Sequence, residues 1–419
     1  MLALEEFAEL SCLGRRSRQK IDSGYLVNLD NIDIKTVCPL IALTLVFSIL
    51  SIGGCVGDSS ARRGGIKAAH QKRALDTKNR VEYSLSGRAV RGEDGSATIV
   101  WSGSTATICF RGADASVDLT DSGQNQFAVL IDDKLRREKL IPEGGREKLE
   151  LVRGLERGEH TIQLVRLTEA SFGQTQIHGF ILGQYAEALP PPKSSVSKIV
   201  IYGDSISAGY GVEGIDEKCG FSPETENYLL TYGAIAARAA GAEVTNISWS
   251  GKGVFTNRGS QTDTVPLPEL FNLALPRDPS SKIENEEADL VLINLGTNDF
   301  APEVKDVTPF TESYKTFVSK VRAMHLNAEI LLTVGPLLSD EWPEGKRALS
   351  KVRKTLMAEM EVRKASGDEK VHVLEFRRVQ PNEGWGCDFH PSKKTHHRMA
   401  RELLGKIQSE KLLPLPQSK

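Results

Sequence analysis

Four short polar segments of this chain contain residues of the types that carry out acyl transfer. The first includes Ser205, in the sequence GDSI directly after the apolar run IVIY. A serine at a strand-to-helix turn is exposed near the positive end of the following helix, and it becomes a nucleophile when a base takes its proton. Taken alone, a turn or helix-capping serine is the more common explanation of this motif.

Two further segments could stabilise negative charge on a reacting oxygen. Gly251 lies in SGKG after the run EVTNIS, and glycine lets a main-chain N–H approach a ligand closely. Asn298 lies in GTND after DLVLINL, where its side-chain N–H can point toward a developing alkoxide. An ordinary turn is the simpler explanation of the first segment alone, and a turn or capping asparagine would explain the second.

The fourth segment, GCDFHP, contains His390 and the nearby carboxylate of Asp388. A histidine held in a loop beside a carboxylate is a candidate general base, whereas a capping or surface histidine is the alternative. His396 and His397 follow on the last predicted helix, and we expect both on the surface.

From residue 198 onward, the elements that must position these residues alternate between strands and helices. The predicted strands are Lys198–Tyr202, Glu243–Ser248, Asp289–Asn294, Glu329–Val334 and Val371–Glu375. The predicted helices are Tyr228–Ala240, Pro309–Met324, Ala348–Ala365 and about Lys394–Leu413. This alternation predicts a parallel sheet covered by helices on both faces, with its chemistry at the carboxyl ends of the strands.

Residues 81–189 have a different pattern, in which short apolar and β-branched runs are separated by turns rich in Gly, Asp and Asn. These runs are Ala97–Trp101, Ala106–Arg111, Ser116–Leu119, Phe127–Ile131, Lys148–Val152 and His160–Arg166. The pattern predicts an antiparallel β-sandwich with Trp101 in its core. The proline-rich residues 190–197 are expected to form a stiff linker to a second domain over residues 198–413, followed by a tail, 414–419.

The N-terminal 55 residues are predicted to direct export. An apolar run, Val37–Ile52, suits the h-region of a signal, and the following IGGC resembles a bacterial lipobox ending at Cys55. A cleaved signal without lipid, or a short buried strand or helix, is the alternative. Residues 1–36 are longer and more mixed than an ordinary n-region. Residues 56–80 are predicted to be a flexible tether.

The composition excludes some classes of partner. The 419-residue length predicts two or three domains, and a formal net charge of -2 gives no basic field for nucleic acid. The six cysteines include no CxxC pair, so we expect no zinc cluster. We expect a monomer that is periplasmic or at the outer surface, with a lipid anchor at Cys55 as its one attachment to a membrane.

The order of the four segments resembles the SGNH (GDSL-type) hydrolases, whereas the absence of GxSxG around Ser205 disfavours the α/β-hydrolases. Longer segments resemble carbohydrate esterase family 2: WSGS (101–104), LTEASFGQTQIHGF (167–180), TENYLLTYGAIAAR (225–238), SGKGVF (250–255) and GCDFHP (386–391). The resemblance covers about residues 81–413. It implies an α/β fold, in which an N-terminal jelly-roll sandwich precedes a three-layer α/β/α domain with a parallel sheet.

The resemblance also implies an esterase that deacetylates plant polysaccharides such as xylan or glucomannan. Ser205 would attack the acetyl carbonyl, and His390 would accept its proton. The main-chain N–H groups of Ser205 and Gly251, with the Asn298 side chain, would hold the oxyanion. No metal or organic cofactor is expected. A lipid or thioester hydrolase of the same superfamily, or a non-catalytic carbohydrate-binding lipoprotein, is the alternative.

The sequence allows more than one role for each of three residues beside the predicted base. In the broader family the supporting aspartate stands three residues before the histidine, but position 387 is Cys here and Asp388 stands two before it. A main-chain carbonyl could therefore replace the aspartate. Trp385 is a candidate platform for a sugar ring, with a packing role as the alternative. Cys387 could form a disulfide with Cys219 in an oxidising compartment, or both could be free thiols.

Overall fold

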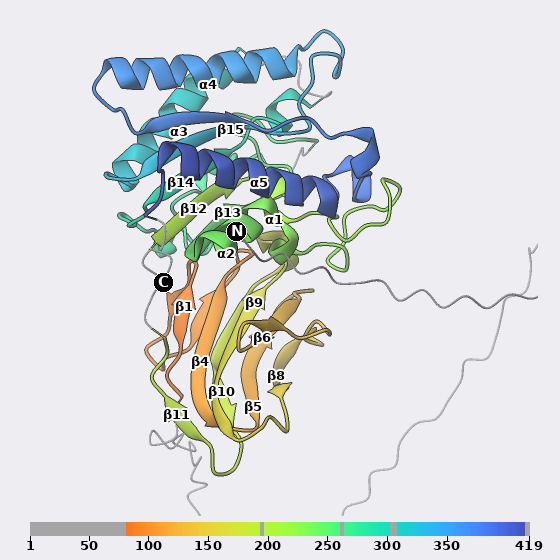
Figure 1. Ribbon diagram of the computed structural model, residues 1–419, viewed down its shortest axis with the longest axis vertical. Coiled ribbons are helices and arrows are strands. Elements are labelled where there is room, and N and C mark those ends of the chain that lie inside the picture. Colours follow the sequence, from red (N-terminus) through yellow and green to blue (C-terminus); the bar gives the residue numbers. More distant parts are fainter. Residues whose placement is uncertain (1–80, 193–196, 260–263, 302–307, 415–419) are drawn as a thin grey trace, which may run out of the picture. The chain divides into compact units, whose positions relative to one another are not determined.

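The computed structural model describes residues 81–192, 197–259, 264–301 and 308–414 (Figure 1). The predicted export segment, Cys55 and the tether therefore lie outside the described residues, as do residues 193–196 of the predicted linker and all but the first residue of the tail. Within the described ranges, no helix has the length and apolar character needed to cross a bilayer.

The N-terminal part consists of two antiparallel sheets. The first has the order β1 (Ser84–Ser86), β4 (Thr105–Gly112), β9 (Gly158–Arg166), β6 (Phe127–Ile131) and β7 (Lys134–Leu135), with β11 (Glu187–Leu189) also paired to β4. The second has the order β2 (Val90–Arg91), β3 (Ala97–Ile99), β10 (Thr175–Leu182), β5 (Ala115–Asp121) and β8 (Gly145–Val152). Every second residue of β5 is buried, which is the pattern of a strand with one face on a core.

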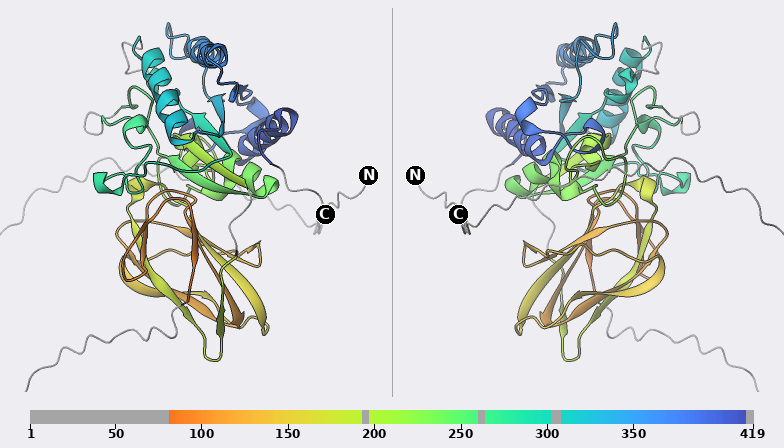
Figure 2. Two further views of the ribbon diagram at one scale, coloured as in Figure 1. Left: turned by 90° about the vertical axis from the view of Figure 1, so that its left-hand side faces the viewer. Right: turned by 90° about the vertical axis from the view of Figure 1, so that its right-hand side faces the viewer.

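Figure 2 shows the two sheets from two further sides. Their inner faces form one apolar core. Ile108 of β4 and Ile162 of β9 lie in the same cluster as Val117 of β5 and Ile177 of β10, and all four side chains are fully buried. The sheets therefore pack face to face and confirm the predicted sandwich.

The C-terminal part contains a five-stranded parallel sheet. Its order is β13 (Ala242–Ser248), β12 (Ser197–Gly203), β14 (Leu290–Asn294), β15 (Glu329–Val334) and β16 (Val371–Glu375). All five residues of β14 are buried, because helices cover both faces of the sheet. The strand order reverses direction at β12, and such a switch point is where parallel sheets bind ligands beyond the strand ends.

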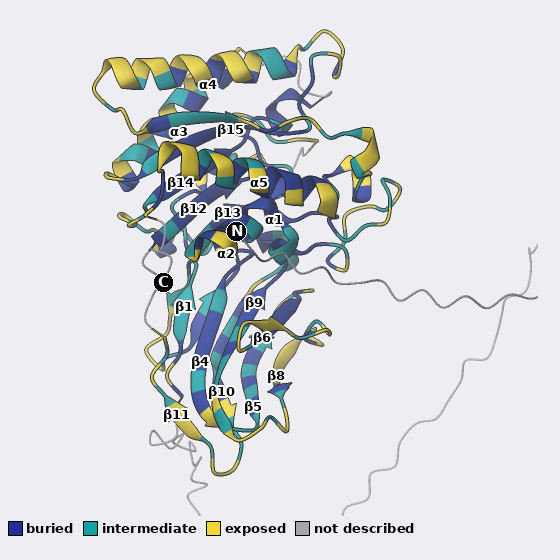
Figure 3. Cartoon of the chain, in the orientation of Figure 1, coloured by how far each residue is buried: buried dark blue, intermediate teal, exposed yellow. Residues whose placement is uncertain are grey.

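Helices α2 (Tyr232–Ala240) and α5 (Lys393–Glu410) pack on one face of this sheet, with Tyr232 and Met399 in a core shared with Ile201 of β12. Helices α3 (Phe310–Met324) and α4 (Ala348–Ala365) share a second core with the opposite side chains of the strands. Figure 3 shows buried strands beneath helices whose outward faces are exposed. The predicted three-layer α/β/α architecture is therefore confirmed.

The two parts are connected by buried polar contacts. Arg88, from the sandwich, donates from Nη2 to Glu286 Oε2 at 2.8 Å and to the Tyr202 hydroxyl at 3.2 Å. Trp101 is buried, but it lies in the core of the parallel-sheet part with Val200 and Trp249 and not in the sandwich core, and its indole N–H donates to the main-chain oxygen of Leu273 at 3.2 Å. Sandwich residues thus help to fix the parallel-sheet part, in addition to packing against each other.

Candidate active site

Ser205 is placed by the tight turn between β12 and a short helix, α1 (Ser205–Ala208). Asp204 caps this helix, because its Oδ1 accepts the main-chain N–H of Ile206 at 3.0 Å. A Cβ at position 203 would lie 2.5 Å from the Ser207 Cβ, so the turn requires glycine there. The GDSI sequence therefore brings the Ser205 hydroxyl to the carboxyl end of the sheet.

The structure brings Ser205 and His390 together. His390 Nε2 lies 2.8 Å from Ser205 Oγ, and the two residues are 6% and 8% exposed. His390 follows the 3-10 turn Cys387–Phe389 and precedes α5. A hydroxyl within hydrogen-bond distance of a neutral imidazole is the pair that nucleophilic catalysis needs.

The other ring nitrogen of His390 faces main-chain carbonyls. Nδ1 lies 3.1 Å from the oxygen of Cys387 and 3.2 Å from that of Asp388. A hydrogen at Nδ1 can therefore be donated to this pair of acceptors, which leaves Nε2 free to accept the Ser205 proton. The ring orientation is set by the local backbone.

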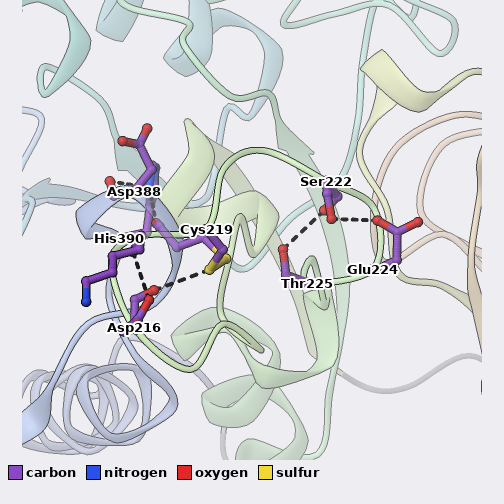
Figure 4. The surroundings of a disulfide bond; sticks show 9 residues. Asp216, Cys219, Ser222, Glu224, Thr225, Asp388 and His390 are labelled. Atoms are coloured by element: carbon purple, nitrogen blue, oxygen red, sulfur yellow. Dashed lines mark hydrogen bonds between the residues drawn. A yellow bond between two sulfur atoms is a disulfide. The ribbon is translucent and has the colours of Figure 1, made fainter. Parts of the chain in front are cut away.

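The carboxylate of Asp388 is not part of this arrangement. Asp388 is exposed, with a left-handed φ of 50°, and no hydrogen bond within the described residues joins its carboxylate to the His390 ring. In Figure 4 the carboxylate points away from the nearby disulfide. The charge of Asp388 acts on Tyr210 instead, because burial first and this charge second raise the pKa of the Tyr210 hydroxyl to about 12. The geometry is that of a Ser–His dyad supported by carbonyls.

Burial determines the charge of the base. It lowers the pKa of His390 to about 3, while the contacts with Cys387 and Asp388 oppose this shift and the Arg258 charge adds to it. The ring of Tyr210 lies 3.9 Å from the His390 ring, centroid to centroid, and gives it an aromatic neighbour. The imidazole is therefore neutral near pH 7, as a general base must be.

The candidate oxyanion donors lie on loops after three adjacent strands. Gly203 at the end of β12 is in register with Ser248 of β13 and Asn294 of β14, so the loops carrying Ser205, Gly251 and Asn298 start from one edge. Gly251 has a φ of 80°, which favours glycine. Asn298 Nδ2 donates to the Lys252 oxygen at 2.9 Å and so connects the second and third loops.

Asp299 holds the second loop in place. Its carboxylate accepts the main-chain N–H groups of Val254, Phe255 and Thr256 at 3.0, 2.7 and 3.1 Å. Burial raises the pKa of Asp299, although these donors oppose the shift. Asp299 was not among the predicted site residues, although it stands next to Asn298 in the GTND motif.

Cys219 and Cys387 form a disulfide (Figure 4). It joins the loop after α1 to the segment that carries His390. The Cys387 N–H also donates to the Gly211 oxygen at 3.0 Å, and the Asp388 N–H donates to the Glu217 oxygen at 3.1 Å. The carbonyl that faces His390 Nδ1 therefore belongs to a backbone segment held by covalent and hydrogen bonds.

Aromatic side chains lie around the base. Trp385, the predicted sugar platform, is partly buried and has its ring 5.8 Å from that of Phe389, centroid to centroid. Phe389 is 58% exposed. Phe221, two residues after Cys219, stacks on Tyr210 at a centroid distance of 4.9 Å. Sequence reasoning missed Phe389, Phe221 and Tyr210, although Phe389 is part of the GCDFHP segment.

The predicted exposure of His396 is wrong. His396 is fully buried between α5 and α2, where its Nδ1 accepts the Tyr232 N–H at 3.1 Å, because this face of α5 packs on α2. His397 is exposed, as predicted. Across the described ranges, no group of three or more His, Cys, Asp or Glu side chains is arranged to hold a metal ion.

Two sequence families match consecutive parts of the chain. Residues 85–192 match the family described as carbohydrate esterase 2 N-terminal, and residues 201–398 match the GDSL-like lipase/acylhydrolase family. The chain is 35% identical over 317 residues to the cellulase/esterase CelE of Acetivibrio thermocellus, covering 74% of this chain but 37% of that protein. It is 26% identical over 325 residues to an acetylxylan esterase / glucomannan deacetylase of Cellvibrio japonicus, covering 76% of this chain and 86% of that protein.

A solved structure shows the same fold over both parts. It is a family two carbohydrate esterase from Clostridium thermocellum in complex with cellohexaose, with a TM-score of 0.72 and 33% identity. The alignment covers 78% of this chain and 99% of that one. The two matching families stand in the same order as the sandwich and the three-layer part, and the likeness extends along nearly the whole of a solved esterase. The chain therefore belongs to carbohydrate esterase family 2.

Proposed function

We propose that this chain is a serine esterase that removes acetyl groups from an O-acetylated polysaccharide or oligosaccharide. The observation that carries the proposal is the contact of 2.8 Å between Ser205 Oγ and His390 Nε2, with His390 Nδ1 directed at main-chain carbonyls. The activity named for the Cellvibrio japonicus relative supports xylan or glucomannan as the substrate class.

In the first half of the reaction, Ser205 Oγ attacks the acetyl carbonyl carbon while its proton moves to His390 Nε2. The carbonyl oxygen becomes an oxyanion that accepts hydrogen bonds from the Ser205 and Gly251 N–H groups and the Asn298 side chain. Each such donor is worth about 3–4 kcal/mol in the transition state. The bond from the acetyl carbon to the sugar oxygen then breaks, and His390 returns the proton to that oxygen.

In the second half, water hydrolyses the acetyl-Ser205 ester. His390 takes a proton from the attacking water, a second oxyanion forms in the same place, and the bond to Ser205 Oγ breaks. The proton on His390 passes to Ser205 Oγ, and acetic acid leaves and loses its own proton to solvent. The neutral imidazole set by burial is the form that both attacks require.

The sugar is proposed to bind beside the base. Trp385 and the exposed Phe389 present aromatic surface there, and sugar rings stack on such surface. Export of the protein, with lipid attachment at Cys55 as its favoured form, remains a proposal supported by the N-terminal sequence. The disulfide between Cys219 and Cys387 is consistent with an oxidising compartment. A monomeric state is likewise proposed.

A panel of substrates tests the function. The purified protein is incubated with acetylated xylan, acetylated glucomannan, p-nitrophenyl acetate, p-nitrophenyl palmitate and acetyl-CoA, and released acetate or chromophore is measured. We expect release of acetate from at least one polysaccharide, with little activity on palmitate or the thioester. Preference for palmitate or acetyl-CoA would support the lipid or thioester alternative. Binding of polysaccharide without hydrolysis of any ester would support the non-catalytic alternative.

A further inference from the structure

A buried glutamate of the sandwich part reaches the loop that carries Gly251. Glu169 follows β9, and its Oε2 accepts both the main-chain N–H of Ser250 at 2.9 Å and the Ser250 hydroxyl at 2.5 Å. Its Oε1 accepts the Ser171 hydroxyl at 2.5 Å. The residue is completely buried. A carboxylate with three donors is thus placed one residue from a proposed oxyanion donor.

Two other buried ionisable residues hold Glu169 in position. The main-chain N–H of Glu169 donates to Glu226 Oε1 at 2.7 Å, and the Arg166 guanidinium donates to the Glu169 main-chain oxygen at 3.1 Å. Arg166 and Glu226 are also completely buried. Hydrogen bonds therefore hold both peptide groups that flank the Glu169 side chain, which limits how the side chain can reach Ser250.

We propose that Glu169 is a positioning residue that orients the Ser250–Gly251 peptide, so that the Gly251 N–H points at the oxyanion. This inference rests on the proposed esterase function. Two bonds from one carboxylate oxygen fix both the N–H and the side chain of Ser250. The rotation about the Ser250 backbone, which sets the direction of the next N–H, is then restricted.

The far side of the same turn is also held. Gly251 O accepts the Arg258 N–H at 2.9 Å, and the Lys252 N–H donates to the Trp249 oxygen at 3.2 Å. With Asn298 bonded to the Lys252 oxygen, the bonds to Glu169 complete the support of this loop. An oxyanion donor is effective only when it is oriented before the charge forms, which is why support of this kind affects the rate.

Hydrogen bonding, rather than charge, explains how Glu169 would act. An anion beside the forming oxyanion would repel it, so the benefit must come from geometry. Burial raises the pKa values of Glu169 and Glu226. Glu169 accepts three hydrogen bonds from Ser171 and Ser250, and these favour its ionised form. Glu226 Oε2 has no hydrogen-bond partner within the described residues, so Glu226 is the better site for a proton.

The test compares Glu169→Ala with Glu169→Gln. Glutamine keeps an oxygen that accepts from Ser250, whereas alanine removes it. With p-nitrophenyl acetate, we expect Glu169→Ala to lower kcat about 10- to 100-fold with KM within about twofold, because small misplacement of a catalytic group costs this much. Glu169→Gln should restore kcat to within about threefold of the wild type. Glu359→Ala, which removes a buried glutamate on α4, is the matched control and should keep kcat.

A second readout separates positioning from loss of stability. Methylboronic acid forms a tetrahedral, anionic adduct with an active serine and therefore mimics the oxyanion. We expect its inhibition constant to rise in Glu169→Ala by about the same factor as kcat falls, while Glu359→Ala changes the melting temperature alone. Equal kcat and equal inhibition in the wild type and both Glu169 variants would overturn the inference and leave the esterase proposal standing. A wild-type protein that hydrolyses no acetyl ester would overturn both.

Discussion

At the scale of single residues, His390 is held by two carbonyl groups where many serine hydrolases use a carboxylate. Carbonyls at 3.1 and 3.2 Å can orient the ring and fix its tautomer. They supply less charge than an aspartate to stabilise the imidazolium that forms when Ser205 loses its proton. The carboxylate of Asp388 makes no hydrogen bond to the His390 ring among the described residues, and so His390 and Asp388 should respond differently to mutation.

We predict that His390→Ala is nearly inactive, while Asp388→Ala, which removes a carboxylate with no hydrogen bond to the base, loses only about tenfold in kcat/KM. Part of the second loss is conformational, because alanine is strained at a φ of 50°. Asp388→Asn tolerates this backbone and should lose less. His397→Ala, an exposed histidine on α5, is the control and should keep full activity. Equal losses in His390→Ala and Asp388→Asn would show that Asp388 is a full triad member.

The buried state of His390 predicts a pH dependence. Because burial lowers its pKa from the ordinary 6.5 to about 3, the neutral base persists below pH 6.5 and is lost when the pH falls through the lowered value. The acidic limb of kcat/KM for p-nitrophenyl acetate should therefore lie clearly below pH 6.5. Initial rates between pH 4 and pH 8 measure it, with circular dichroism at each pH to confirm folding. A limb centred at or above pH 6.5 would contradict the prediction.

At the scale of elements, the bounds of strands with a simple apolar pattern could be predicted closely from the sequence. Phe127–Ile131, Glu329–Val334 and Val371–Glu375 agree residue for residue, because their apolar runs end at clear turns. Strand β10 was missed. The register of β10 against β5 shifts between Ile177 and Gly179, and such a bulge interrupts the alternation that identifies a strand.

Helix boundaries and site contacts were predicted less well. The predicted helix Tyr228–Ala240 is a 3-10 turn followed by α2, since the Thr231 side chain caps α2 by accepting the Ala234 N–H. Motifs at strand ends pointed to Ser205, Gly251 and Asn298, and a motif before the last helix pointed to His390. Local patterns carry no information on which distant side chain meets them, so the contact from Glu169 to Ser250 could not be predicted.

The disulfide between Cys219 and Cys387 is expected to affect both stability and turnover. Cys219→Ser should lower the free energy of unfolding by about 4–5 kcal/mol in the chain-entropy model, because the bridge closes a long loop. It should also lower kcat, since the Cys387 carbonyl then loses one of its anchors beside His390. Urea unfolding and turnover of p-nitrophenyl acetate measure the two effects. Cys109→Ser, which changes the one free cysteine among the described residues, is the control.

Peptide mapping without reduction checks the bridge itself. Protein taken from its native compartment should yield a peptide pair that joins Cys219 to Cys387. Free alkylation of Cys387 in that protein would contradict the disulfide and the support that it gives to the base.

At the scale of the whole molecule, the sandwich contributes to the parallel-sheet part through buried side chains. Arg88 reaches Tyr202 and Glu286, Trp101 packs against Trp249, and Glu169 reaches Ser250. Trp249 and Ser250 stand directly before Gly251 in the chain. The sandwich thus supports one of the loops on which the proposed chemistry depends, which gives a physical reason for its presence beside the hydrolase fold.

The central claim is that this chain hydrolyses acetyl esters through Ser205. The most direct measurement is kcat of Ser205→Ala on p-nitrophenyl acetate and on the polysaccharide that the panel identifies. Loss of a serine nucleophile costs about a million-fold in turnover, so the variant should show no measurable activity while its circular dichroism and melting temperature stay close to the wild type. Ser222→Ala, in the loop near the disulfide, should remain fully active. A folded Ser205→Ala protein that kept more than about a tenth of the activity would contradict the account.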